Sequence, residues 1–269
     1  NKLSRIGFES ENVTCAQLDA LKETFPLADF VPCGGIIEKM REIKTPEEVR
    51  NIIAAQRIAE KALERLFTLI SPNMTEIDVA LELEYGMRKL GAEKTSFDTI
   101  AVSGTASSMP HGVPRNAKLE KGFLTMDFGA LYNGYCSDMT RTVVIGKADT
   151  EMKKVYHTVL EAQLAALDFV AAGKLGSDCD KTARDIIYAA GYEGCFGHSL
   201  GHGVGMYIHE EPRLSYTYNK PLEIGAVVTV EPGIYLQGKY GVRIEDMVYL
   251  SENGTVNLTE AKKELIELF

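Results

Sequence analysis

Four acidic residues in two similar segments are the part of this sequence best suited to chemistry. The first segment opens with Asp127 and closes with Asp138, and the second opens with Glu231 and closes with Glu245. Both openings read T-x-[D/E]-x-G, and the residues around the acids are mostly apolar. Buried carboxylates persist only when they are paired with positive charge or bound to metal. The four acids therefore predict a metal site that holds more than one ion.

Histidines add nitrogen ligands to this set. Four of the five histidines lie in segments marked by glycine or proline, namely His111, His198, His202 and His209. Residues 197–205 are too rich in glycine for a comfortable helix, so His198 and His202 do not form a helical pair of zinc ligands. Four carboxylates and an imidazole suit manganese, cobalt, iron or zinc. Two such ions can lower the pKa of a shared water, which predicts hydrolysis of an amide or ester.

No rival nucleophile is evident in the sequence. Neither the G-x-S-x-G pattern of serine hydrolases nor the phosphate-binding G-x-x-x-x-G-K-[S/T] pattern occurs in the chain. The metal site is therefore the chemistry that the residues favour.

Each acidic segment follows the same order of expected elements. The first half predicts helices at 45–70 and 75–89, then strands at 96–102, 123–131 and 135–145. The second half predicts helices at 150–172 and 177–190, then strands at 204–208, 226–236 and 242–250, with a short final helix at 261–268. The repeat predicts a duplicated α+β unit whose sheets pack about a pseudo-twofold axis, with helices outside. In that arrangement the four acids meet at a shared centre.

The composition limits the classes of partner. The chain has 269 residues, of which 45% are hydrophobic, and a net charge of −9 at pH 7. Nucleic acid and anionic membranes need basic surfaces, and no apolar run reaches the roughly 18 residues of a membrane span, so we expect neither as a partner. Five scattered cysteines without a C-x-x-C pair are typical of free thiols in a reducing cytoplasm, where we expect this protein.

Several segments together resemble the pita-bread metallopeptidases, and within them the proline-specific branch of Xaa-Pro aminopeptidases and Xaa-Pro dipeptidases (prolidases). The matching segments are 110–112, 126–129, 134–142, 198–205, 209–210, 230–235 and 242–246. The resemblance implies the duplicated pita-bread (creatinase/aminopeptidase) fold, with antiparallel sheets and helices outside. It assigns 43–269 to a catalytic domain, and it makes 1–42 the expected remnant of a truncated N-terminal domain.

The resemblance also implies a metal-binding role for five residues. Asp127 binds one ion, while His202 and Glu231 bind the other. Asp138 and Glu245 bridge both ions. Glu231 is in addition the general base that takes a proton from the water between the ions.

Three histidines and one arginine complete the implied site. His111 and His209 act as catalytic and substrate-binding residues that steady the substrate carbonyl and the tetrahedral oxyanion. His198 binds substrate near the leaving-side pocket, and Arg243 orients acidic groups and contributes to substrate binding. Tyr235 is expected to pack rather than to take part in the chemistry.

The implied activity is hydrolysis of the peptide bond between an N-terminal residue and a following proline, by a hydroxide that bridges two divalent metal ions per chain. Manganese is the expected metal, with cobalt, iron or zinc as alternatives. The expected partners are short peptides with proline in the second position, and a homodimer is compatible with the resemblance. The sequence does not separate aminopeptidase from dipeptidase specificity.

Three alternatives stay open at this point. A methionine aminopeptidase-like enzyme shares the predicted metal ligands, but the segment before residue 43 and the Gly-Tyr-Cys-Ser-Asp hairpin favour the proline branch. A non-catalytic pita-bread binding module typically loses metal ligands, and none is missing here. The third alternative is a metal-independent creatinase-like amidinohydrolase. Such an enzyme would not need the complete ligand set that this sequence carries.

Overall fold

The computed structural model describes residues 4–269 of the chain. The chain divides into two units between Arg41 and Glu42. Within the described residues, no helix is long and apolar enough to cross a membrane.

The first unit has little material for a core. It contains β1 (Arg5–Phe8), α1 (Cys15–Thr24) and β2 (Asp29–Pro32), followed by α2 (Ile36–Glu42), which ends just beyond the boundary. β1 and β2 pair in parallel, and α1 begins with a capping box between Thr14 and Gln17. None of the residues of α1 is buried. These elements therefore lack the apolar layer of an independent core.

The helices of the second unit begin where local sequence signals place them. They are α3 (Pro46–Leu69), α4 (Glu76–Lys89), α5 (Thr150–Phe169) and α6 (Gly176–Ala189). Thr45 and Thr75 cap α3 and α4 through capping boxes, and Asp149 caps α5 by accepting a hydrogen bond from the Met152 N–H. The four predicted helices of 45–190 are thus confirmed.

Two principal sheets carry the acidic segments. The first has the strand order β16-β8-β5-β4 and the second has the order β10-β9-β11-β14-β15. Their strands are β4 (Ile100–Ser103), β5 (Gly122–Phe128), β8 (Met139–Ile145), β9 (Gly201–Gly203), β10 (Glu210–Leu214), β11 (Val227–Val230), β14 (Asp246–Ser251), β15 (Gly254–Asn257) and β16 (Glu267–Leu268). All pairs in these sheets are antiparallel except that of β16 with β8.

Smaller strands form two further sheets, β3-β6-β7 and β12-β13, and one turn of 3-10 helix accompanies them. They are β3 (Lys94–Thr95), β6 (Ala130–Tyr132), β7 (Tyr135–Cys136), β12 (Gly233–Leu236), β13 (Tyr240–Arg243) and the 3-10 turn Gly104–Ser108. β6 and β7 form the hairpin after the first acid, and β12 and β13 form the hairpin after the third. Both predicted hairpins are therefore present.

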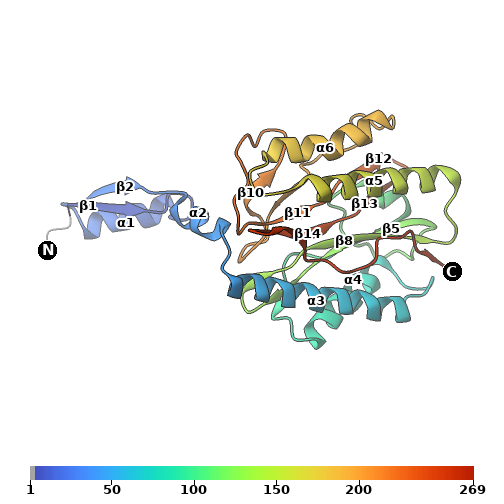
Figure 1. Cartoon of the computed structure of the whole chain (residues 1–269). Coiled ribbons are helices and arrows are strands. Elements are labelled where there is room, and N and C mark those ends of the chain that lie inside the picture. The colour runs from blue at the N-terminus through green and yellow to red at the C-terminus, as the bar shows by residue number, and fades with distance from the viewer. Residues whose placement is uncertain (1–3) are drawn as a thin grey trace. The chain divides into compact units, whose positions relative to one another are not determined.

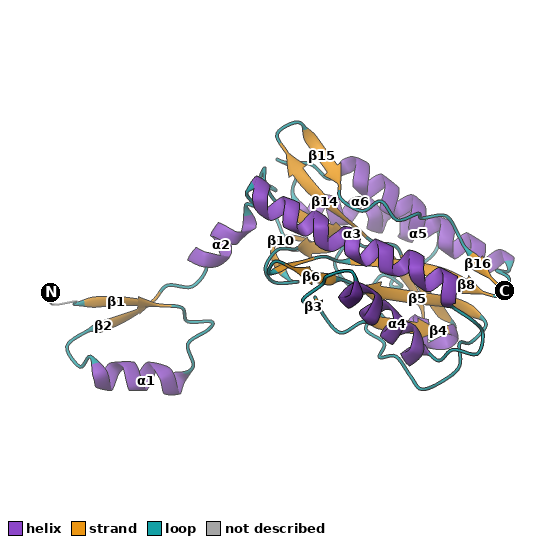
Figure 2. Ribbon diagram, turned by 90° about the horizontal axis from the view of Figure 1, so that it is seen from below, coloured by secondary structure: helices purple, strands orange, loops and turns teal. Residues whose placement is uncertain are grey.

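The second unit is a duplicated structure with helices outside. Figure 1 shows α3 and α4 on one side of the strands and α5 and α6 on the other. Figure 2, seen from below, shows α3 and α4 in front of β5 and β8. One apolar cluster joins α3 and α4 to β5 and β8, and another joins α5 and α6 to β11 and β14. The predicted α+β pita-bread architecture is confirmed.

The predicted helix at 261–268 is wrong. The segment is extended, and its last residues form β16 beside β8. Arg141 donates hydrogen bonds to the carbonyls of Ala261 and Lys262, and the Tyr156 hydroxyl donates to the carbonyl of Lys263. Because these carbonyls are bonded to other parts of the molecule, they do not serve a local helix. The strand expected at 204–208 is also displaced, because β9 ends at Gly203 and a loop follows.

Candidate metal centre

Strand ends bring the four acids together. Asp127 lies in β5, opposite Thr140 of β8. Asp138 lies just before β8, which begins at Met139. In the second sheet, Glu231 follows β11 and Glu245 precedes β14. The Glu245 N–H donates to the Thr140 carbonyl at 3.2 Å, which joins the two halves at this point. All four acids line one cavity of about 270 Å³.

His202 enters the same cavity from β9. Glycine allows this close approach, since a Cβ atom at Gly201 would overlap the Thr229 carbonyl of β11. The Nε2 atom of His202 lies 3.3 Å from Glu231 Oε1 and 3.6 Å from Asp138 Oδ2. The Nδ1 atom lies 3.1 Å from the Gly203 carbonyl, which can only accept a hydrogen bond, so Nδ1 carries the hydrogen. Nε2 therefore carries the free lone pair that a metal ligand needs.

Three ligand atoms are already clustered tightly. Asp138, His202 and Glu245 each offer one donor atom, and these atoms lie within 4.8 Å of one another. Asp127 and Glu231 border this cluster and are held by other partners. Arg243 Nη2 donates to Asp127 Oδ2 at 2.6 Å, and Thr229 Oγ1 donates to Glu231 Oε1 at 3.1 Å.

The charges of the cluster fit a divalent cation. Burial, followed by repulsion from neighbouring carboxylates, raises the pKa of Asp138 and Glu245 well above their ordinary range. Burial also raises the pKa of Glu231 to about 8, against the opposing effect of Arg243. The Oδ1 atom of Asp127 is buried without a hydrogen-bond partner among residues 4–269. One buried guanidinium cannot balance four carboxylates, so this donor set is suited to hold additional positive charge.

Arg243 connects the acids to the rest of the site. Its Nε atom donates to Thr140 Oγ1 at 3.0 Å, and that hydroxyl donates to Glu245 Oε2 at 2.7 Å. Its Nη1 atom donates to the Tyr235 hydroxyl at 2.6 Å and to the Pro110 carbonyl at 3.2 Å. The guanidinium is 3% exposed, so its donors serve the protein rather than solvent. Arg243 thus lines the same cavity as the acids and contacts Asp127 directly and Glu245 through Thr140.

The remaining histidines surround the cavity in different ways. His111, His198 and His209 all line it. His198 is held on both ring nitrogens, by the Ser199 carbonyl at 2.9 Å and the Tyr235 hydroxyl at 2.9 Å. Burial lowers the pKa of His198 and of His202 to about 3, and burial also lowers the pKa of His209. At neutral pH these imidazoles are uncharged.

The expectation that Tyr235 takes no part in the chemistry stays a prediction, but the residue does more than pack. Its hydroxyl accepts from Arg243 and bonds to His198, so it belongs to the network of the site. Thr140 and Thr229 were also missed, although the repeated T-x-[D/E] opening was a signal for Thr229. Arg213 was missed as well, because it follows the histidine-containing loop without any motif of its own, yet it lines the cavity.

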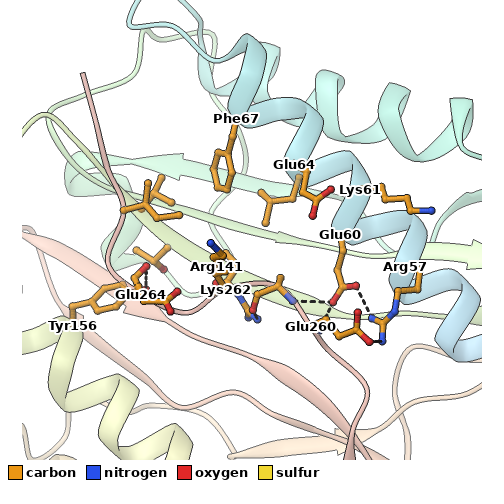
Figure 3. A pocket seen from close by; sticks show the side chains of 15 residues that line it. Arg57, Glu60, Lys61, Glu64, Phe67, Arg141, Tyr156, Glu260, Lys262 and Glu264 are labelled. Atoms are coloured by element: carbon orange, nitrogen blue, oxygen red, sulfur yellow. Dashed lines mark hydrogen bonds and ion pairs between the residues drawn. The ribbon is translucent and has the colours of Figure 1, made fainter.

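A larger cavity of about 510 Å³ lies elsewhere, between α3 and the segment 260–266. Figure 3 shows its charged rim, where Arg57 bonds to Glu60 and Glu260. None of the residues around this cavity lines the smaller one. Volume therefore does not identify the site, and the convergent carboxylates and imidazole do.

A family model described as metallopeptidase family M24 matches residues 50–252. This chain belongs to metallopeptidase family M24. A second model, described as the creatinase/prolidase N-terminal domain, matches residues 1–43. The predicted family and the prediction of a hydrolase are confirmed, and membership implies that divalent metal ions bind at the cluster of Asp138, His202 and Glu245.

Several relatives of this M24 metallopeptidase are similar over nearly its whole length. An Xaa-Pro dipeptidase of Pyrococcus furiosus is 42% identical, over 97% of this chain and 75% of the relative. The solved structure of an Xaa-Pro dipeptidase from Bacillus anthracis is 45% identical, with a TM-score of 0.96, and the match covers 98% of this chain and 75% of that one. The structure of an X-Pro aminopeptidase from Thermotoga maritima is 41% identical, with a TM-score of 0.94, over 99% and 76% of the two chains.

Proposed function

We propose that this M24 metallopeptidase hydrolyses the peptide bond between an N-terminal residue and a following proline, and that it prefers Xaa-Pro dipeptides. The observation that carries the hydrolytic part is the convergence of four carboxylates and one imidazole on a single cavity. Relatives at 42% and 45% identity that are named Xaa-Pro dipeptidases support the substrate class. We further propose that residues 43–269 form the catalytic domain, since all of the site residues lie in it.

Five residues would hold the metal. We assign Asp127, Asp138, His202, Glu231 and Glu245 to two divalent ions, with manganese as the first choice and cobalt, iron or zinc as alternatives. Two divalent ions match the charge of four carboxylates. When bound at such a set, divalent ions polarise a carbonyl and lower the pKa of water.

Glu231 is suited to move the proton of the attacking water. Its Oε1 atom is oriented by the Thr229 hydroxyl at 3.1 Å, and that hydroxyl is in turn fixed by the His202 N–H at 3.0 Å. A carboxylate held in this orientation at the cavity can accept a proton from a water beside it. Glu231 therefore takes the proton from water and can return it to the leaving nitrogen of proline.

The three histidines divide the handling of the substrate. His111 and His209 line the cavity, and no hydrogen bond from another described residue occupies either ring. They can donate to the substrate carbonyl and stabilise the oxyanion that develops on it. Both ring nitrogens of His198 are occupied, so this residue contributes the edge and face of its ring as a wall of the pocket.

Arg213 supports the preference for dipeptides. An Xaa-Pro dipeptide ends in a carboxylate next to the proline ring, whereas a longer peptide continues with an amide. Arg243 is committed to Asp127 and Tyr235, whereas within residues 4–269 the ion pair of Arg213 is a loose contact of 3.8 Å with Glu211. Arg213 is therefore the cation at the cavity that can bind the carboxylate of a substrate. Phe97, Ile100 and Ile208 supply apolar wall for the pyrrolidine ring.

Manganese-loaded protein tests the proposal directly. We expect hydrolysis of Met-Pro, slower hydrolysis of Met-Pro-Ala and little hydrolysis of Met-Ala. Faster cleavage of Met-Ala than of Met-Pro would instead indicate a methionine aminopeptidase-like enzyme. Equal rates for Met-Pro and Met-Pro-Ala would contradict the dipeptide preference and leave the proline specificity intact.

A further inference from the structure

An isolated ion pair is buried beside the loop that carries His209. Lys44 Nζ donates to Glu210 Oε2 at 3.2 Å, and the two side chains are only 2% and 5% exposed. Burial lowers the pKa of Lys44, although Glu210 acts in the opposite direction. Removing one member of such a pair leaves a buried charge without compensation, which is far more costly than replacing both. The pair therefore constrains the two segments that it joins.

The carboxylate of Glu210 closes the base of the loop 205–209. Its Oε1 atom accepts a hydrogen bond from the Tyr207 N–H at 3.0 Å, and the Gly205 N–H donates to the Tyr207 carbonyl at 3.1 Å. A Cβ atom at Gly205 would collide with the Glu210 carboxylate, so the loop backbone lies directly against this group. The Gly205 carbonyl accepts from the Cys136 N–H at 2.8 Å, which attaches the loop to β7.

His209 itself has few contacts that could hold it. The residue is exposed, and its ring touches His202 edge-on with centroids 4.4 Å apart. No hydrogen bond to its ring is found within residues 4–269. A catalytic group on an exposed loop reaches a productive geometry only if its support is rigid. The position of His209 therefore depends on Glu210, the buried residue that follows it in the chain.

We propose that Lys44 and Glu210 are positioning residues that hold His209 over the substrate pocket. Lys44 neutralises the buried carboxylate, which fixes the turn at Tyr207 and with it the imidazole two residues later. The inference rests on the proposed function, because it assumes that His209 acts on the substrate. Neither positioning residue lines the cavity, so both act through His209.

The test compares Lys44→Met in two backgrounds, the wild type and His209→Ala, with Met-Pro as substrate and manganese saturating. In the wild type we expect Lys44→Met to lower kcat by about ten- to a hundredfold with little change in KM, because a small displacement of a catalytic group is costly. In the His209→Ala background we expect no further decrease in kcat. A merely structural contribution would reduce kcat by the same factor in both backgrounds.

Arg57→Met is the matched control. It also removes the cation beside a buried glutamate, Glu60, whose side chain is 8% exposed, but this pair borders the other cavity (Figure 3). We expect its kcat to stay within about twofold of wild type. Bound manganese should be equal in all folded variants, as measured by elemental analysis.

If Lys44→Met does not fold, Glu210→Ala replaces it, because a lysine with a lowered pKa can release its proton when its partner is removed. For Glu210→Ala we expect the same result as for Lys44→Met, namely a lower kcat in the wild type and no further decrease in the His209→Ala background. Wild-type kcat in the replacement, or an equal reduction in both backgrounds, would overturn the inference and leave the proposed function in place. Full activity of His209→Ala would instead remove His209 from the mechanism.

Discussion

At the scale of single residues, Glu231 combines two functions. It is one of the proposed metal ligands, and its oriented carboxylate is the proposed proton acceptor. Its partner His202 is kept uncharged by burial, which lowers the pKa of the imidazole to about 3. The two side chains lie 3.3 Å apart, so a change at either one affects both binding and chemistry.

Substitution of Glu231 by alanine should abolish turnover. We expect kcat for Met-Pro to fall by about 10³-fold or more, because the general base is lost, and the protein to retain less metal. The measurement is steady-state hydrolysis together with the metal content after gel filtration. Glu223→Ala, which removes an exposed glutamate of the same half, is the control and should behave as wild type. Normal turnover in Glu231→Ala would refute the assignment.

Substitution of Arg213 by alanine should act on binding of the substrate carboxylate. We expect KM for Met-Pro to rise by about tenfold or more, the cost of one charge-assisted hydrogen bond. KM for Met-Pro-amide should hardly change, because this substrate has no carboxylate at that position. An equal rise for both substrates would show that Arg213 serves the shape of the pocket rather than recognition of charge.

At the scale of elements, close packing of β9 against β11 places His202 among the acids. Residue 201 must be glycine for this approach, because a Cβ atom would enter the space of Thr229. Gly197, four residues earlier in the same glycine-rich run, has no atom within 4 Å of its hypothetical Cβ. The two glycines therefore have different structural roles in spite of their common context.

Gly201→Ala should separate these strands, whereas Gly197→Ala should be tolerated. We expect Gly201→Ala to lower the free energy of unfolding by about 1–3 kcal/mol and to weaken manganese binding. The Gly197→Ala control should stay within about 0.5 kcal/mol of wild type. Urea unfolding of the metal-free proteins and a manganese titration measure both effects. Equal stability of the two variants would contradict the strand packing described here.

At the scale of the whole molecule, the buried acids link stability to pH and to metal. Burial raises the pKa of Glu231 from an ordinary 4.5 to about 8, and it raises the pKa values of Asp138 and Glu245 in the same direction. Below about pH 6.5 the histidines of the site, whose pKa values burial lowers, act in the opposite direction, since the unfolded chain protonates them first. Between about pH 6.5 and 8 the unfolded histidines are neutral, and the folded protein binds more protons than the unfolded chain. Its stability therefore decreases as the pH rises through this range. The pKa of Glu76 is lowered, because hydrogen bonds from Arg115 and Ser103 outweigh the effect of burial. Such a carboxylate changes the stability only at more acidic pH.

The metal-free protein should consequently lose stability as the pH is raised from about 6.5 to about 8. Saturating manganese should remove most of this loss, because the cation takes the place of the protons. In Glu231→Gln the slope without metal should be smaller, since one titrating group is gone. Chemical unfolding at several pH values, with and without manganese, provides the measurement. A metal-free stability that stays constant or rises over this range would contradict the burial of the acids.

Local signals in the sequence were sufficient for much of the fold. Thr45 and Thr75 begin their helices through contacts with residues three positions away, so the sequence alone predicts these starts. The segment 261–268 shows the limit of this reasoning. Its sequence predicts a helix, but Arg141 donates hydrogen bonds to two of its carbonyls and β8 pairs with its last residues. Both partners lie more than a hundred residues away in the chain.

For the site, the sequence by itself predicted the acids and histidines that the structure brings to one cavity. Acids of this spacing on apolar strands, with histidines in glycine-rich turns, predict a metal-dependent hydrolase because buried charge needs a counter-charge. Only the tertiary structure decided how these groups are held. Tyr235, Thr140, Arg213 and the pair of Lys44 with Glu210 have no distinctive motif, and their importance depends on partners from distant strands. Hydrogen bonds and ion pairs act over a few ångströms in space, whatever the separation in sequence, so such partners become apparent only when the chain is folded.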